Sequence, residues 1–219
     1  MTSRTPNRSR LPGAILSLAL VAIVLYWCVP RKADLRAFDP ATISVLETAM
    51  WRDYYDKRYL ALFCDLYRST RNEFGFSPLD SLKIAFAAAD AARVFQPTRS
   101  RAEANAALPA LVTYYGLLAR GAPAPFDVEK AASLELDWWQ ARREDIPPET
   151  YGLTIAATSA MLYGRSDALM TQAGVERAQA MAYRDQHGHS MTDADWAEIQ
   201  TRLFKAYSEL RRSVNPATP

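Results

Sequence analysis

Apolar residues along this chain recur with helical spacing and are interrupted by Pro, Gly and short polar turns. Beyond residue 38 the spacing predicts seven helices, most of them opened by a Ser, Thr or Asp N-cap or by an early Pro. Their predicted ranges are 39–71, 77–95, 99–119, 127–143, 147–164, 166–186 and 192–212. No alternating strand pattern competes with them. We therefore expect an all-α body, a compact bundle or a short α-solenoid of about seven helices.

Residues 11–30 form a continuous apolar run without a charged side chain. A helix of this length, at 1.5 Å per residue, extends for about 30 Å, the thickness of the hydrocarbon core of a bilayer. A cleaved signal peptide is the competing interpretation, because a basic tail precedes the run, but no small-residue cleavage pattern follows it. We expect an uncleaved signal-anchor, a single transmembrane helix.

These segments define the expected organisation of the chain. It comprises a basic N-terminal tail (1–10), the transmembrane anchor (11–30), a juxtamembrane linker (31–38), the helical domain (39–213) and a disordered tail (214–219). Basic residues flank the anchor on both sides, so the positive-inside rule does not decide its orientation. Because the N-terminal tail contains no acidic residue, we expect it in the cytoplasm, the anchor in the cytoplasmic (inner) membrane and the body outside the cytoplasm.

Charge and cysteine content narrow the classes of partner. The formal net charge of the whole chain is +2, and the N-terminal tail carries Arg4, Arg8 and Arg10, so the body is close to neutral. A neutral body argues against a nucleic-acid partner. The two cysteines, Cys28 and Cys64, are too few for a disulfide framework or a zinc knuckle.

Several charged side chains lie on the apolar faces of the predicted helices over 39–71, 127–143 and 166–186. In the first of these, Glu47 and Arg58 share an arc of about 100° with Trp51, a width typical of a buried face. An ion left alone in such a place costs several kcal/mol, so these groups need partners. The inward charges and the aromatic residues beside them are Glu47, Trp51, Tyr55, Arg58, Glu135, Trp139, Arg142, Arg177 and Arg184.

Two interpretations of this set remain open. In the first, the glutamates accept hydrogen bonds from guanidinium groups that also stack on aromatic rings, which gives a structural salt-bridge network. In the second, four inward arginines exceed two inward glutamates, and an anionic small ligand neutralises the surplus. Asp65 and Asp185 lie near the same faces and would close this gap without a ligand.

Two of the predicted helices share a short motif. Glu47-Thr-Ala-Met-Trp51 and Glu135-Leu-Asp-Trp-Trp139 both read E-x-x-[MW]-W and lie 88 residues apart. We treat an internal duplication as a hypothesis.

Motifs of known catalytic chemistry are missing from the sequence. It contains no E-x-x-H pair, G-x-S-x-G, P-loop or dinucleotide fingerprint. Its two histidines, His187 and His189, lie near a predicted helix end, where they favour the helix dipole. Arginine neighbours would lower the pKa of Glu47 and Glu135, which suits a general acid in glycoside cleavage poorly. We expect no catalytic residue, no metal and no cofactor.

The expected function is a non-catalytic binding or assembly module, a scaffold or accessory subunit held at the membrane through residues 11–30. Its partner would be a protein in a membrane complex, and no nucleic acid. The alternative is a membrane-bound receptor or enzyme, directed for instance at a wall glycan, that takes an anionic small molecule in a pocket of Arg, Glu and aromatic side chains.

Overall fold

The computed structural model describes residues 11–28, 32–188 and 190–216. Within these ranges the chain is helical and contains no strand, which confirms the all-α prediction. The predicted N-terminal tail (1–10), the end of the predicted anchor (29–30), Arg31, His189 and the last residues (217–219) lie outside the described part.

Helix α1 (Leu11–Cys28) precedes a body in which nine α-helices are described. They are α2 (Pro40–Tyr55), α3 (Tyr59–Arg68), α4 (Pro78–Phe95), α5 (Arg101–Ala104), α6 (Leu108–Leu118), α7 (Val128–Arg143), α8 (Pro148–Tyr163), α9 (Ala168–His187) and α10 (Asp193–Val214). Six of these helices begin where a side chain accepts a hydrogen bond from the backbone N–H three residues later. The capping residues are Asp39, Ser77, Ser100, Asp127, Asp167 and Thr192.

Two of the seven predicted helices are divided, which corrects the sequence analysis. The helix predicted over 39–71 stops at Tyr55, and Lys57 adopts a left-handed backbone conformation (φ 59°) before α3 begins. The helix predicted over 99–119 consists of α5, a 3₁₀ turn and α6, with Pro109 in the first turn of α6. Proline has no N–H to donate, so it favours a helix start at this position.

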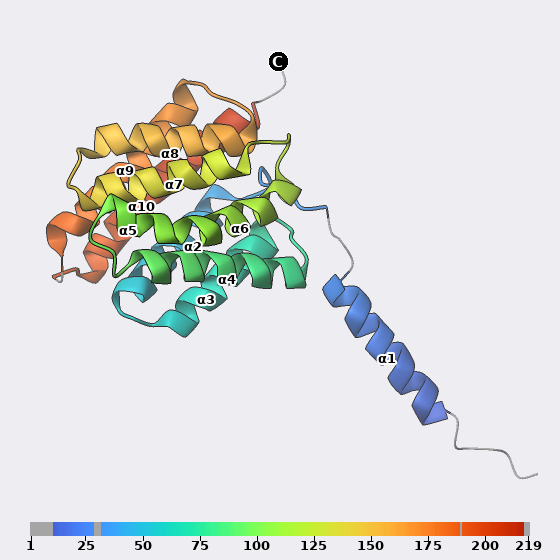
Figure 1. The fold of residues 1–219 in the computed structure, drawn as a ribbon. Helices are drawn as coiled ribbons and strands as arrows, with labels where there is room; N and C mark the ends of the chain where they lie inside the picture. The colour runs from blue at the N-terminus through green and yellow to red at the C-terminus, as the bar shows by residue number, and fades with distance from the viewer. Residues whose placement is uncertain (1–10, 29–31, 189, 217–219) are drawn as a thin grey trace, which may run out of the picture.

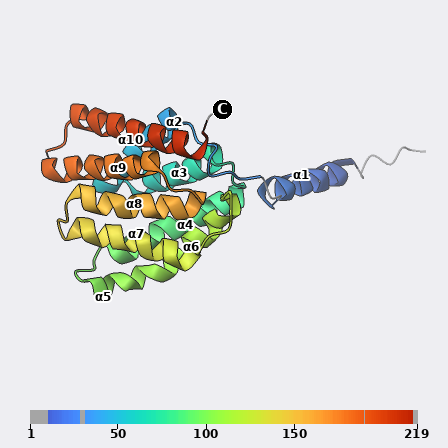
Figure 2. The same cartoon turned by 90° about the horizontal axis from the view of Figure 1, so that it is seen from above.

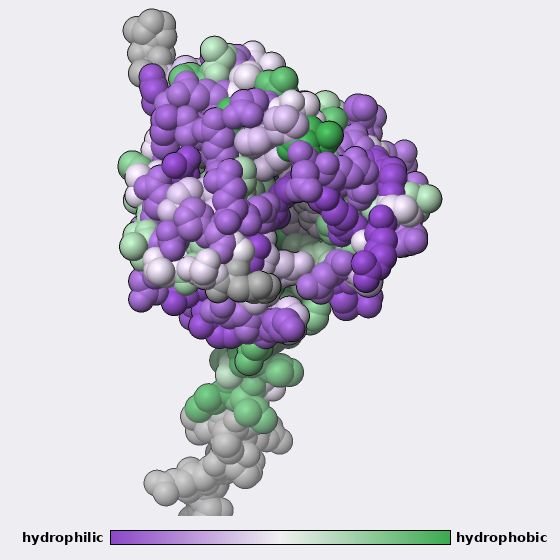
Figure 3. Space-filling view, turned by 90° about the vertical axis from the view of Figure 1, so that its left-hand side faces the viewer, coloured by the Kyte–Doolittle hydropathy of each residue, from purple (hydrophilic) through white to green (hydrophobic). Residues whose placement is uncertain are grey.

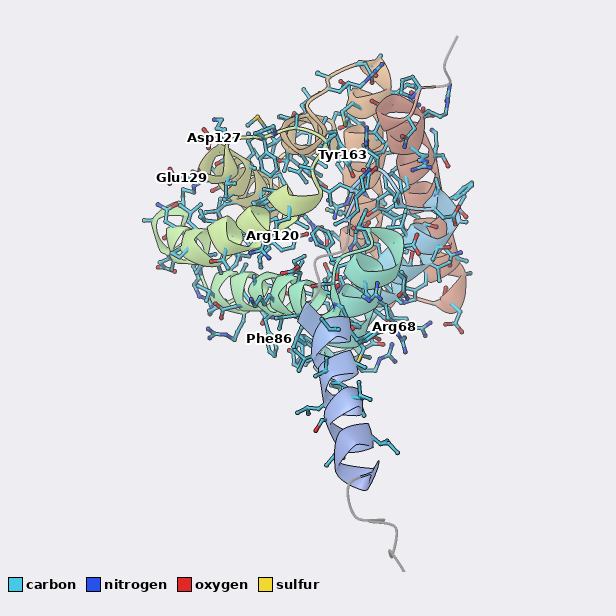
Figure 4. The ribbon with its side chains drawn as sticks, turned by 90° about the vertical axis from the view of Figure 1, so that its right-hand side faces the viewer. Arg68, Phe86, Arg120, Asp127, Glu129 and Tyr163 are labelled. Carbon is cyan, nitrogen blue, oxygen red and sulfur yellow. The ribbon has the colours of Figure 1, made fainter. Side chains whose placement is uncertain are left out.

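The helices of the body close into a ring. In the order α2, α3, α4, α6, α7, α8, α9 and α10, each packs against the next, and α10 packs against α2. Seen from the α1 side, the helices surround a central region filled with side chains (Figure 4). The predicted helical bundle is therefore confirmed in the form of a closed ring.

Short connections make successive helices antiparallel, so the ring has two distinct ends (Figures 1 and 2). The C-terminal ends of α2, α4, α7 and α9 lie together at one end. Helix α1 leaves from the opposite side and contacts α4. The segment over 32–38, predicted as a linker, packs onto the ring through Leu35 and Phe38, which are 2% and 1% exposed.

The apolar core lies mainly where neighbouring helices of the ring meet. The largest cluster includes Ile84 of α4, Leu111 of α6 and Leu136 of α7, all fully buried. A second cluster joins α9 to α10, because Ala180 of α9 packs with Ile199 and Leu203 of α10. This arrangement leaves aromatic and charged side chains to fill the centre of the ring.

Helices α8 and α9 approach closely at two glycines. A Cβ atom on Gly174 would overlap the carbonyl oxygen of Gly152 and lie 2.7 Å from the backbone nitrogen of Ala156. We expect Gly174→Ala to force the helices apart and destabilise the fold by about 1–3 kcal/mol, seen as a lower midpoint of thermal unfolding. Gly116→Ala is the matched control, because the nearest atom there is 4.0 Å from the added Cβ. Equal losses in the two variants would contradict the close contact.

Apolar side chains cover the described part of α1. From Ile15 to Tyr26 its large apolar side chains are half to three-quarters exposed, and the helix extends away from the ring (Figure 1). Across the described residues, no helix has both the length and the apolar character required to cross a membrane. The anchor expected over 11–30 stays a prediction.

Candidate functional site

A cavity of about 190 Å³ lies at the end of the ring where α2, α4, α7 and α9 terminate. The space-filling view of this end shows a hollow surrounded by hydrophilic residues (Figure 3). The cavity is lined by Trp51, Tyr54, Tyr55, Ala92, Phe95, Trp138, Trp139, Arg142, Arg177 and Met181. Six of these ten residues are aromatic, two are arginines and none is acidic.

The two E-x-x-[MW]-W motifs lie on opposite sides of this cavity. Helices α2 and α7 are both 16 residues long and begin 88 residues apart. Three helices of the ring separate them on either side. Each motif places its final tryptophan, Trp51 or Trp139, in the cavity wall. The glutamate one turn earlier, Glu47 or Glu135, lies deeper in the ring.

Glu47 and Arg177 form an ion pair that joins α2 to α9. The Nε and Nη2 atoms of Arg177 donate to Oε1 of Glu47 over 3.0 and 2.5 Å, and the hydroxyl of Tyr207 on α10 donates to Oε2. Glu47 is buried. Burial lowers the pKa of Arg177, but the adjacent Glu47 outweighs this effect and the pKa lies above its ordinary value. The guanidinium therefore stays charged, and three helices meet at one carboxylate.

Glu135 fixes the orientation of two indole rings in the wall. Its carboxylate accepts hydrogen bonds from Nε1 of Trp138 (2.8 Å), Nε1 of Trp139 (3.0 Å) and the hydroxyl of Tyr115 (2.7 Å). Burial, followed by the charge of Glu135, raises the pKa of Tyr115 well above its ordinary value. The donors are neutral, so Glu135 differs from Glu47, whose partner is an arginine.

Arg142 lies at the junction of α2, α7 and α9. Its Nε and Nη2 atoms donate to both carboxylate oxygens of Asp185 over 2.8 and 2.7 Å, and Nη2 also donates to the hydroxyl of Tyr55 over 2.6 Å. Burial lowers the pKa of Arg142, but its hydrogen bonds and charge interactions with Asp185 and Tyr55 together outweigh burial, and the pKa lies above its ordinary value. The guanidinium of Arg184 stacks on the Tyr55 ring at 3.1 Å from its centroid. These contacts hold Tyr55 in the wall.

One guanidinium nitrogen of each wall arginine has no hydrogen-bond partner among the described residues. The Nη1 atoms of Arg142 and Arg177 make no hydrogen bond to any residue that the structure describes. Each of the two side chains keeps 27% of its surface accessible. The acids that pair with them, Asp185 and Glu47, are not part of the wall. The only formal charges presented to the cavity are therefore positive.

The nine residues singled out from the sequence fall into three groups. Five of them line the cavity, namely Trp51, Tyr55, Trp139, Arg142 and Arg177. Glu47, Glu135 and Arg184 hold wall residues in place from outside the lining. Arg58 does not belong to the site, because α2 ends before it. It pairs with Asp53 and Asp56 and is 52% exposed.

The other half of the wall was not among the nine residues singled out from the sequence: Tyr54, Ala92, Phe95, Trp138 and Met181. Helix α4, which contributes Ala92 and Phe95, is apolar or small around most of its circumference and therefore shows no distinct inward face. Helical periodicity places Tyr54, Trp138 and Met181 on the same inward faces as the candidate residues, so the pattern that could have identified them was present.

The wall offers aromatic rings, tyrosine hydroxyls and two guanidiniums. It contains no Ser, Cys, His, Asp or Glu that could act as nucleophile or base. Over the described ranges there is no group of three side chains able to hold a metal ion. His187 lies on Tyr183, with Nε2 3.7 Å from Asp195, near the start of α10. The chemistry available in the cavity is ring contact and hydrogen bonding from two cations.

Comparison with protein-family models, with curated proteins and with solved structures finds no match to this chain.

Proposed function

We propose that this protein is a membrane-anchored binding module whose cavity takes a small organic anion with one apolar ring and does not transform it chemically. The observation that carries the proposal is the composition of the wall, with six aromatic side chains, two arginines and no acid. Such a site, largely apolar with a few convergent polar groups, is typical of small-molecule pockets.

The volume of the cavity limits the ligand to a single ring. An engineered protein cavity of about 150 Å³ binds benzene. The cavity of about 190 Å³ therefore accommodates one ring with a small substituent. Offset or edge-on contacts with aromatic walls contribute about 0.5–1.5 kcal/mol each beyond the area that they bury.

The sign of the ligand's charge follows from the wall. Arg142 and Arg177 each have a free Nη1, and hydrogen bonds from a guanidinium to a carboxylate are about twice as strong as neutral ones. The Nε and Nη2 atoms of these guanidiniums already donate to Asp185 and Glu47. The two arginine side chains are therefore ordered before a ligand binds, which lowers the entropic cost of binding. A cation would meet only like charge. The six aromatic faces alone therefore do not make this a cation site.

The membrane anchor is the second part of the proposal. It is supported by the uncharged stretch over 11–30 and by the exposed apolar side chains of α1. We place the anchor in the cytoplasmic (inner) membrane and the body outside the cytoplasm. Because α1 and the cavity lie on opposite sides of the ring, the cavity would open away from the bilayer (Figure 1). Flotation of the full chain with lipid vesicles tests the anchor.

Benzoate, benzamide and benzamidinium test the binding site, because they share one shape and differ in charge. We expect calorimetric titration of the full chain in lipid nanodiscs to rank benzoate first and benzamidinium last. A hydrogen bond to a charged group contributes about 1.5–3 kcal/mol, so benzoate is expected to bind about 10- to 100-fold more tightly than benzamide.

Arg142→Gln should abolish most of this preference for benzoate and leave benzamide affinity nearly unchanged. The matched control is Arg93→Gln, which removes an exposed guanidinium on α4 whose one ion-pair partner among the described residues is Asp90. It should change neither affinity. Equal affinity for the three compounds, or tighter binding of benzamidinium, would overturn the proposed ligand class.

A further inference from the structure

The two arginines of the cavity wall lie at different depths. Asp185, the ion-pair partner of Arg142, follows Arg177 by eight residues on α9. On α2, the residues that accept from these arginines are Tyr55 and Glu47, which are likewise eight residues apart. Eight residues of an α-helix rise about 12 Å. The cavity therefore has an outer level at Arg142 and an inner level at Arg177.

The wall between these two levels is aromatic and apolar. Trp51 on α2 and Met181 on α9 lie midway between the residues that define the levels. The guanidinium of Arg177 lies over the ring of Trp138, 5.5 Å from its centroid. A ligand ring at this depth has one guanidinium beyond each end. Hydrogen bonds of about 2.8 Å to both guanidiniums leave a length that suits substituents at opposite ends of the ring.

The outer level carries an excess of positive charge. Arg142 and Arg184 both pair with Asp185, so two guanidiniums share one carboxylate. The Nε atom of Arg184 is buried and has no hydrogen-bond partner among the described residues. The side chain of Asp185 is 41% exposed, which places this level at the mouth of the cavity. An anionic group of a ligand is therefore stabilised at the mouth.

The inner level carries an excess of negative charge. Arg177 pairs with Glu47, whose side chain is 5% exposed, and also interacts electrostatically with Glu135. One guanidinium thus neutralises only one of two carboxylates. Burial, followed by the charge of Glu135, raises the pKa of Tyr114 near these groups. A second anionic group of a ligand would be repelled here, whereas a phenol would keep its proton.

An uncharged hydroxyl group is compatible with the inner level. The Nη1 atom of Arg177 makes no hydrogen bond to a described residue and can donate to a hydroxyl oxygen. A hydroxyl is also a small substituent, as the cavity volume of about 190 Å³ requires.

We propose that the ligand is an aromatic anion with an uncharged hydroxyl at the opposite, para end of its ring. Its anionic group binds at Arg142, and its hydroxyl accepts a hydrogen bond from Arg177. This inference rests on the proposed function, which sets one ring and a negative charge and leaves the orientation and the second substituent open. Arg177 is then the residue that determines which substituent is accepted.

A series of benzoates tests the inference on the unmodified full chain in nanodiscs. At neutral pH we expect para-hydroxybenzoate to bind about 10- to 100-fold more tightly than para-methylbenzoate, which has nearly the same size and offers no acceptor. Ortho-hydroxybenzoate, whose hydroxyl lies beside the carboxylate, should gain nothing over benzoate. Terephthalate carries a second carboxylate in place of the hydroxyl and should bind more weakly than para-hydroxybenzoate.

Arg177→Lys separates the inner hydrogen bond from the outer charge. Lysine keeps a positive charge beside Glu47 and lacks the second terminal nitrogen that would donate to the ligand. We expect the preference for para-hydroxybenzoate over para-methylbenzoate to disappear and the preference for benzoate over benzamide to remain. Arg93→Lys makes the same change at an exposed position on α4 and should alter neither preference. If Arg177→Lys does not fold, the ligand series alone decides.

The two proposals fail separately. If benzoate binds no more tightly than benzamide, the proposed function is overturned and this inference with it. If benzoate is preferred but para-hydroxybenzoate and para-methylbenzoate bind equally, or terephthalate binds most tightly, the inner hydroxyl site is overturned and the proposed function stands. An undiminished preference for para-hydroxybenzoate in folded Arg177→Lys would overturn the role of Arg177.

Discussion

Replacing Glu47 by Gln is expected to destabilise the ring by about 3–5 kcal/mol, the usual cost of breaking a buried ion pair from one side. Arg177 would keep its charge, because a guanidinium is not deprotonated in proteins, and it would lose both hydrogen bonds to the carboxylate. Tyr207 would lose its charged acceptor as well. For a chain of this size the loss corresponds to a thermal midpoint lower by about 6–20 °C, measurable by circular dichroism in nanodiscs.

Two variants show whether this loss arises from the unpaired ion. The double variant Glu47→Gln, Arg177→Met removes both charges and should recover part of the stability, because no ion is left without a partner. Asp90→Asn breaks the exposed pair with Arg93 and should cost less than about 1 kcal/mol. If the double variant melts at a lower temperature than Glu47→Gln, the buried ion is not the cause.

Glu135→Leu is expected to destabilise the protein by about 2–6 kcal/mol and to disorder the cavity wall. The substitution leaves two buried donors, Trp138 Nε1 and the hydroxyl of Tyr115, without an acceptor, at about 1–3 kcal/mol each. Trp139 loses its acceptor too. We expect a lower thermal midpoint, a weaker near-ultraviolet circular dichroism signal and weaker benzoate binding.

Glu135→Gln separates hydrogen bonding from charge. Its single amide oxygen can still accept from part of the donor set, so its loss of stability should lie between those of the wild type and Glu135→Leu. Glu129→Gln, on the exposed first turn of the same helix, is the control and should cost less than about 1 kcal/mol. Identical midpoints for Glu135→Gln and Glu135→Leu would show that the hydrogen bonds do not hold the wall.

Helical periodicity was sufficient to place Glu47 and Trp51 on an inward face, because that arc depends only on the local geometry of one helix. The same reasoning failed for Arg58. The break after Tyr55 contains no Gly or Pro, and Lys57 accepts a left-handed conformation that is uncommon for its residue type. Because α3 is a separate helix, the periodicity of α2 does not fix the direction of the Arg58 side chain relative to that of Glu47.

Local sequence patterns could not predict which side chains on different helices of the ring contact each other. Arg177 and Glu47 are 130 residues apart in sequence, and only the packing of α9 near α2 brings them together. Periodicity identified both as inward charges and gave no pairing between them. The contacts of Glu135 are different in kind, because Trp138 and Trp139 follow it by three and four residues, within reach on one helix face. The contacts of Glu135 with the two tryptophans could therefore be predicted from their spacing in the sequence.

The packing of α10 against α2 makes completion of the ring depend on a helix that is synthesised after the other helices of the ring. A nascent chain that ends at α9 has no Tyr207 to donate to Glu47, and the side of α2 that α10 covers stays open to solvent. Contacts of such long sequence separation slow folding and expose apolar surface in the meantime. Helix α10 must therefore leave the ribosome before the N-terminal helices of the body reach their final stability.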